Sequence, residues 1–154
     1  MLEPGDAAPD FELPNQNGEP VRLADQEGLV VLYFYPRADT PGCTTQACSF
    51  RDNWDAYEDR GIPVFGISDD PVEDLADFAE KYDLPIDLLS DEDGTVAEQY
   101  GSYGEKNVFG NVVEGVFRNT YVVRDGVVEA AYRSVDPEGH AEVLLADLDE
   151  LDAE

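Results

Sequence analysis

The chain has 154 residues and a mass of 17.0 kDa, which is the usual size of one domain. A hydrophobic fraction of 42% supplies enough apolar side chains for a packed core. The 36 acidic residues outnumber the 9 lysines and arginines and leave a net charge of −27. This charge excludes nucleic acids and anionic membrane surfaces as partners, because both require a basic patch.

The acidic surplus also indicates the environment in which the protein works. At ~1 M salt the Debye length falls to about 3 Å, so repulsion between carboxylates is largely screened. We therefore expect a halophile as the source. The longest apolar run, 29–35, is far shorter than the ~20 residues of a membrane span, and residues 1–10 carry no basic leader. A cytoplasmic location follows as an expectation.

The first part of the chain predicts a hairpin and then a central strand. Segments 10–13 and 21–23 alternate polar and apolar residues on either side of Asn17-Gly18, a sequence typical of turns. Segment 29–35 is apolar throughout and is ended by Pro36, which is typical of a strand covered on both faces. We expect this strand at the centre of the sheet.

A helical period follows the central strand. Thr40 is a typical N-cap and Pro41 suits the first helical position, so a helix should begin there and place Cys43 in its first turn. Beyond this helix, strands and helices alternate. The predicted elements are a strand at 63–68, a helix from Pro71 to Tyr82, a strand at 86–89 and one or two helical turns at 95–100.

The last third of the chain predicts a loop and a second hairpin. Segment 101–115 is punctuated by glycine, and we expect it to be a loop. Segments 121–123 and 127–132 are apolar and flank Asp125-Gly126, which supplies the positive φ angles of a tight turn. These two strands should pair antiparallel.

A closing helix completes the predicted fold. Asp136 is placed as its N-cap and Pro137 at its first position, and His140 is expected on its surface. The order of elements predicts an α/β protein with a single thioredoxin-like domain over residues 1–154. Its mixed central sheet is flanked by helices, and it begins with the N-terminal hairpin.

Cys43 is the strongest candidate for chemistry in the chain. In the first helical turn it lies among backbone N–H groups without intrahelical partners, which favours an anion. The helix dipole contributes only ~0.3–1 kcal/mol, too little by itself to keep a thiol mostly ionised at neutral pH. A cation must therefore help. Arg37 and Arg118 are the two candidates, and we favour Arg118 because it precedes the strand at 121–123.

Cys48 follows five residues later. In an ideal helix the two Cα atoms would be roughly 8–9 Å apart, whereas a disulfide needs less than ~7 Å. A bond between the cysteines would therefore require the helix to unwind, which indicates a switch. A small buried residue at Cys43 and an incidental surface thiol at Cys48 are the structural alternatives. With His140 as the only further soft ligand, a zinc site would lack a fourth partner, so we expect no metal.

The segment around Cys43 reads Tyr-Pro-x-x-x-Thr-Pro-Gly-Cys-Thr-Thr-x-x-Cys, with Pro36 and Thr40 at its fixed positions. It resembles the active-site signature of the peroxiredoxins, most closely that of the bacterioferritin-comigratory, or Q-type, branch. The resemblance extends from the opening Gly5-Asp6-x-Ala8-Pro9-Asp10-Phe11 to the final helix. It implies a peroxidatic cysteine, a resolving cysteine and a peroxide pocket. These roles fall on Cys43, on Cys48, and on Pro36, Thr40 and Arg118, in that order.

The resemblance implies a thiol peroxidase for hydrogen peroxide and organic hydroperoxides. A sulfenic acid on Cys43 would be resolved by Cys48 as an intramolecular disulfide, and a thioredoxin-like or other dithiol reductant would reopen it. No metal, flavin or haem is implied, and the branch is commonly monomeric or weakly dimeric. The alternatives are a non-catalytic redox-sensing disulfide switch and a general disulfide reductase. The absence of Cys-x-x-Cys argues against the reductase.

Overall fold

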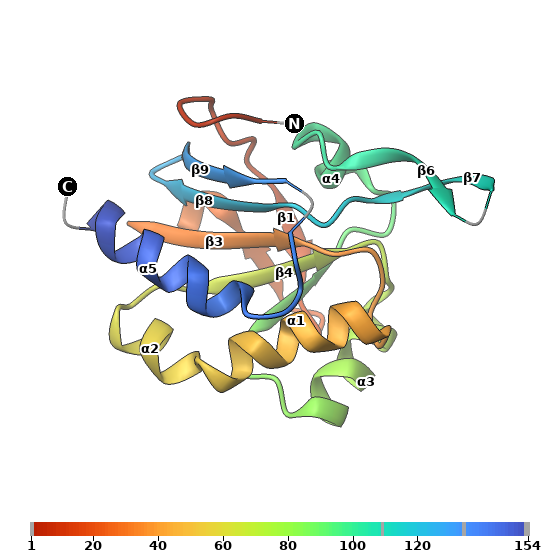
Figure 1. Cartoon of the computed structure of the whole chain (residues 1–154), viewed down its shortest axis with the longest axis horizontal. Coiled ribbons are helices and arrows are strands. Elements are labelled where there is room, and N and C mark those ends of the chain that lie inside the picture. The colour runs from red at the N-terminus through yellow and green to blue at the C-terminus, as the bar shows by residue number, and fades with distance from the viewer. Residues whose placement is uncertain (1, 109, 134, 153–154) are drawn as a thin grey trace.

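The computed structural model describes residues 2–108, 110–133 and 135–152, so the domain predicted over 1–154 extends past the described residues at both ends. A five-stranded sheet with the order β5-β4-β3-β8-β9 forms the centre (Figure 1). Its strands are β3 (Leu29–Phe34), β4 (Val64–Ser68), β5 (Asp87–Ser90), β8 (Thr120–Arg124) and β9 (Val127–Tyr132). β3, β4 and β5 are parallel, and β8 and β9 are antiparallel to their neighbours. The sheet is therefore mixed, as predicted.

β3 is buried on both faces because its side chains are apolar at every position. Successive residues of a strand point to opposite faces, so odd and even residues enter different clusters. Val31 and Tyr33 pack into the cluster that contains Cys43 and Phe50. Val30 and Leu32 pack into the cluster on the opposite face. This burial fixes the end of β3, from which the chain turns toward Cys43.

Helices and the N-terminal hairpin cover the two faces of the sheet. The helices are α1 (Pro41–Asp52), α2 (Trp54–Asp59), α3 (Val72–Tyr82), α4 (Thr95–Gln99) and α5 (His140–Asp152). α1, α3 and α5 contribute to the Cys43 cluster on one face. α4 and the β1 (Glu12–Pro14) and β2 (Pro20–Arg22) hairpin, with its following turn η1 (Leu23–Asp25), lie on the other. The predicted α/β fold, a mixed sheet with flanking helices and an N-terminal hairpin, is confirmed. No helix of the described residues is long and apolar enough to cross a membrane.

The loop predicted over 101–115 was wrong. The chain there forms β6 (Tyr103–Val108) and β7 (Asn111–Val116), an antiparallel hairpin that projects from the body of the protein (Figure 1). A two-stranded hairpin outside the main sheet does not need the apolar alternation of a core strand. Its strands therefore left no clear pattern in the sequence.

Two expectations for the closing helix also need correction. α5 begins at His140, not at Pro137, because Gly139 has a left-handed φ of 69°. Asp136 instead accepts a hydrogen bond from the N–H of Glu138 (3.0 Å), as in an Asx turn. His140 is buried, not on the surface: its ring packs edge-on against Phe50, and its Nε2 lies 3.0 Å from the Thr120 hydroxyl.

Candidate active site

The candidate site lies where β3 ends and α1 begins, at the carboxyl end of a central parallel strand. α/β proteins commonly place their chemistry at this edge. Thr40 has extended backbone angles, and its carbonyl accepts the N–H of Thr44 (2.8 Å), so it caps α1 as predicted. Pro41 occupies the first helical position. The Thr40 hydroxyl does not bond a helix N–H, however, and donates to the carbonyl of Arg37 (2.8 Å).

Cys43 lies in the first turn of α1 with only 2% of its surface exposed. Its Sγ accepts a hydrogen bond from Nη2 of Arg118 at 3.2 Å. The two residues are 75 positions apart, but β8 pairs with β3 and Thr120 lies opposite Tyr33, so Arg118 reaches the same edge of the sheet. A guanidinium at this distance favours the negative thiolate. The structure therefore places the predicted cation beside the predicted nucleophile.

A second contact fixes the Arg118 guanidinium. Nη1 donates to Oε1 of Gln46 at 2.7 Å, and Gln46 is fully buried. Gln46 lies three residues after Cys43, on the same face of α1. The resemblance singles out Gln46 as a departure, because the Q-type branch usually has Glu there, and it implies a change in the hydrogen bonding of the helix start. The contact of Gln46 with Arg118 was not predicted, although its helical spacing from Cys43 could have indicated it.

Gly42 lets the guanidinium come close to the helix backbone. A Cβ at this position would lie 3.0 Å from Nη2 of Arg118, which is tighter than ordinary contact. A residue without a side chain is therefore favoured at this position of the Thr-Pro-Gly-Cys sequence.

Arg37, the other candidate cation, is exposed and lines a separate hollow with Lys81. Pro36 follows β3 directly and is half-buried at the start of the loop.

Cys48 has different surroundings. It lies on the same unbroken helix as Cys43, but it is only partly buried, and both cysteines are free thiols. The residue borders an open groove between α1 and the start of α5. The charged residues of this groove are Asp52, Glu138 and Glu142. The geometry thus separates a buried sulfur beside an arginine from an accessible sulfur in an acidic groove.

Tyr33 of β3 and Tyr35, which follows the strand, lie beneath α1. Tyr33 stacks on Phe50 with ring centroids 4.8 Å apart, and Tyr35 packs beside it at 5.5 Å. Burial raises the pKa of both phenols, and the nearby Cys43 adds to the effect. Both therefore stay neutral. They give the sulfur an apolar floor from which water is excluded.

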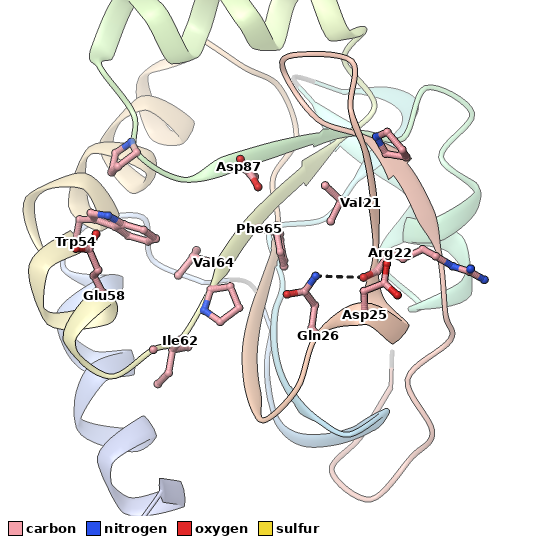
Figure 2. Close-up of a pocket in the computed structure, with 14 residues that line it drawn as sticks. Val21, Arg22, Asp25, Gln26, Trp54, Glu58, Ile62, Val64, Phe65 and Asp87 are labelled. Carbon is pink, nitrogen blue, oxygen red and sulfur yellow. Dashed lines mark hydrogen bonds between the residues drawn. The ribbon is translucent and has the colours of Figure 1, made fainter.

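Neither a metal cluster of the described residues nor the cavity beside Trp54 marks this site. Within residues 2–108, 110–133 and 135–152, no group of three or more His, Cys, Asp or Glu side chains is arranged to hold a metal. A cavity of about 500 Å³ lies between β2 and α2, with Trp54 on one wall and Val21 on the other (Figure 2). No cysteine is among the residues that line it. Cys43 is therefore identified by its contacts with Arg118 and the core, and not by this cavity.

Comparisons with known proteins agree with this geometry. Residues 4–131 match the AhpC/TSA family. The chain is 47% identical over 146 residues to peroxiredoxin Bcp of Escherichia coli K12, covering 94% of each chain. It superposes on the crystal structure of peroxidoxin BcpB from Mycobacterium tuberculosis with a TM-score of 0.86 and 41% identity, covering 97% of this chain and 98% of the other.

An activity is described for a third relative, which is also a solved structure. The bacterioferritin comigratory protein of Xanthomonas campestris is described with an alkyl peroxide reduction activity. Its structure matches with a TM-score of 0.85 and 32% identity over 91% of this chain and 90% of the other. These matches confirm the thioredoxin-like peroxiredoxin fold. The chain therefore belongs to the AhpC/TSA family and is a peroxiredoxin of the Bcp, or Q, type.

Proposed function

We propose that the protein reduces hydrogen peroxide and organic hydroperoxides with Cys43 as the nucleophile and Cys48 as the resolving thiol. The observation that carries this proposal is the 3.2 Å contact between Nη2 of Arg118 and the buried Sγ of Cys43. The contact supports a thiolate, which is the reactive form of cysteine. The alkyl peroxide reduction named for the Xanthomonas campestris relative supports the choice of substrate.

In the first step the Cys43 thiolate attacks one peroxide oxygen. An S–O bond forms, the O–O bond breaks, and the departing oxygen takes a proton and leaves as water or an alcohol. Negative charge develops on that oxygen. The Arg118 guanidinium and the N–H groups of the first turn of α1 are fixed donors that stabilise it. Thr40 contacts the peroxide, and Pro36 shields the sulfur from water.

In the second step Cys48 resolves the sulfenic acid. Its sulfur displaces the hydroxyl of the sulfenic acid, so that a disulfide and one water form. Both cysteines lie on one continuous helix, in which their Cα atoms are too far apart for a relaxed disulfide. α1 must therefore unwind locally before the bond closes. The free thiols of the present state belong to the reduced enzyme.

A dithiol protein of the thioredoxin type then returns the enzyme to this state. One of its thiolates attacks the disulfide and its second thiol completes the exchange, so that two electrons pass to Cys43 and Cys48. The open groove at Cys48 supports attack at this sulfur. A reducing cytoplasm supplies such reductants. Hydroperoxides are neutral, so the net charge of −27 does not repel them.

We also propose that the enzyme works at high salt. Few of its 36 carboxylates can find a partner among 9 cations. The pairs that form among the described residues are Arg22–Asp10, Arg51–Asp52, Arg60–Asp149 and Lys81–Asp39. The remaining acids repel one another until salt screens them. The melting temperature should rise when potassium chloride is increased to ~1 M, and a flat profile would oppose a halophilic origin.

Peroxide consumption in the presence of excess dithiothreitol tests the proposed activity. The wild type should consume many equivalents per chain, and Cys43→Ser should consume none above the uncatalysed background. A redox sensor without catalytic function would stop after one equivalent. Retained turnover in Cys43→Ser would refute the assignment of the nucleophile.

A further inference from the structure

The loop that joins β3 to α1 is tied to the neighbouring strand by a buried carboxylate. Oδ2 of Asp70 accepts the backbone N–H of Ala38 at 2.7 Å and the hydroxyl of Ser68 at 2.8 Å. The backbone carbonyl of Asp70 accepts the Ser90 hydroxyl at 2.6 Å. Asp70 is only 6% exposed. The ends of β4 and β5 therefore hold the middle of this loop through one residue.

The next residue of the loop, Asp39, is also held by side-chain hydrogen bonds. Asp39 has a φ of 58°, a left-handed conformation that side chains other than those of glycine, asparagine and aspartate rarely adopt. Its carboxylate accepts hydrogen bonds from the Tyr82 hydroxyl (2.9 Å) and from Nζ of Lys81 (3.0 Å), both at the end of α3. Such a conformation persists only when its surroundings hold it. The Asp39–Lys81 ion pair lies at the surface, because both side chains are about half-exposed.

The residues on either side of these two anchored positions, Arg37 and Thr40, make a contact that bears on chemistry. The Thr40 hydroxyl donates its proton to the carbonyl of Arg37 at 2.8 Å. A hydroxyl has one proton to donate, so the Thr40 oxygen is left with lone pairs that can only accept. A hydroperoxide still carries a proton on one oxygen. Thr40 is therefore set to accept the O–H of a neutral hydroperoxide and to align it with Cys43.

We propose that Asp70 and Asp39 are positioning residues that hold the loop so that the Arg37 carbonyl fixes Thr40 as an acceptor for the neutral hydroperoxide. The inference rests on the proposed peroxidase function. Neither carboxylate touches the reacting atoms. Their effect should therefore fall on the reaction with peroxide and spare other reactions of the Cys43 sulfur.

Two rate constants separate positioning from a general structural role. In a Cys48→Ser background, Cys43 is reacted either with hydrogen peroxide or with iodoacetamide, which needs the thiolate but no Thr40. Asp70→Ala should slow the peroxide reaction about tenfold, the scale of one lost hydrogen bond, and change alkylation less than about twofold. Asp70→Asn keeps an acceptor for the Ala38 N–H and should recover most of the rate. Asp74→Ala, an exposed acid of the same hollow on α3, is the matched control.

A double-mutant cycle tests the route through Thr40. Thr40→Val alone should slow the peroxide reaction, and Asp70→Ala should then have no further effect. Additive losses would overturn the inference, and so would equal slowing of both reactions by Asp70→Ala. If Asp70→Ala fails to fold, Asp39→Gly serves instead. It keeps the left-handed backbone but loses the carboxylate, and it should slow the peroxide reaction alone.

The outcomes also distinguish this inference from the proposed function. A wild type that fails to react with peroxide contradicts the peroxidase itself. A wild type that reacts, with Asp70→Ala and Asp39→Gly reacting equally fast, contradicts only the positioning role.

Discussion

Cys43 and Cys48 lie on one helix, yet their surroundings differ in every respect that matters for thiol chemistry. Cys43 is buried, lies in the first turn and accepts a hydrogen bond from Arg118. Cys48 is five residues further along, partly exposed, and borders a groove with the carboxylates Asp52 and Glu142. The proposed roles follow these surroundings. The first sulfur lies beside a cation, and the second residue borders an open groove.

The proposed mechanism requires the reduced form to rearrange during turnover. Cys43 contacts Arg118 and the core, and the intact helix holds it apart from Cys48. Formation of the proposed disulfide would have to break these contacts. The experiments below change one side of this contrast at a time.

Replacing the accessible sulfur should have the largest effect on turnover and none on the first step. Cys48→Ser should lose sustained peroxide consumption when a thioredoxin-type protein is the reductant, because no intramolecular disulfide forms. Cys43 should still react with one equivalent of peroxide at the wild-type rate. Stopped-flow oxidation and a sulfenic-acid trapping reagent measure the two quantities. A slower first step in Cys48→Ser would mean that the two sites are not separate.

Removing the Arg118 cation beside the buried Cys43 should have the next largest effect on the rate of reaction with peroxide. Arg118→Ala should lower the second-order rate constant for peroxide by about 10²–10³, the usual cost of one fixed donor to a developing oxyanion. Arg118→Lys keeps a positive charge but cannot bond Cys43 and Gln46 with the same fork, so it should recover only part of the rate. Equal rates for Arg118→Ala and the wild type in stopped-flow assays would contradict the assignment.

The protein should lose stability at acid pH through His140, whose buried ring packs on Phe50 of α1. Burial lowers the pKa of His140 from 6.5 to about 4. The unfolded chain therefore takes up the proton first as the pH falls, and the histidine costs stability between about pH 6.5 and pH 4. From pH 7 to pH 5 the loss is roughly 2 kcal/mol.

Denaturant unfolding of the wild type and His140→Gln at these two pH values measures the histidine's share. The variant should lose less free energy of unfolding than the wild type over this interval. Both proteins contain the same carboxylates, so their titration cancels in the difference. Identical losses would show that His140 is not buried as a neutral ring.

The smallest expected effect comes from Gly42. In Gly42→Ala the new Cβ would lie 3.0 Å from Nη2 of Arg118, so the guanidinium must shift by a few tenths of an ångström. We expect the peroxide rate constant to fall only a few-fold, roughly 1 kcal/mol or less. A loss as large as that of Arg118→Ala would mean that Gly42 does more than leave room.

Local patterns were enough to predict the elements that carry the site. The apolar run at 29–35 and the Thr-Pro pair at 40–41 placed the strand, the helix start and Cys43, because each depends on neighbours in sequence. The contact with Arg118 joins residues 75 positions apart, and the sequence offered Arg37 as a rival. The position of Arg118 before the strand at 121–123 favoured it over Arg37, and the family resemblance strengthened that choice.

What the sequence did not reveal depends on long-range packing or on a single backbone angle. Gln46 and Asp70 are polar residues whose burial follows from partners on other elements. The burial of His140 requires α5 to dock on α1. The left-handed Gly139 moved the start of that helix, and the strands at 103–108 and 111–116 pair only with each other, outside the main sheet.

The central claim is that the buried sulfur of Cys43, held by Arg118, is the atom that peroxide oxidises. The most direct test is to mix Cys48→Ser and Cys43→Ser separately with one equivalent of hydrogen peroxide and to follow the intact mass with time. Cys48→Ser should gain one oxygen atom rapidly and stoichiometrically, on the peptide that contains Cys43. Cys43→Ser should stay unchanged over the same period. Rapid oxidation of Cys43→Ser, or a Cys48→Ser protein that reacts no faster than free cysteine, would contradict the account.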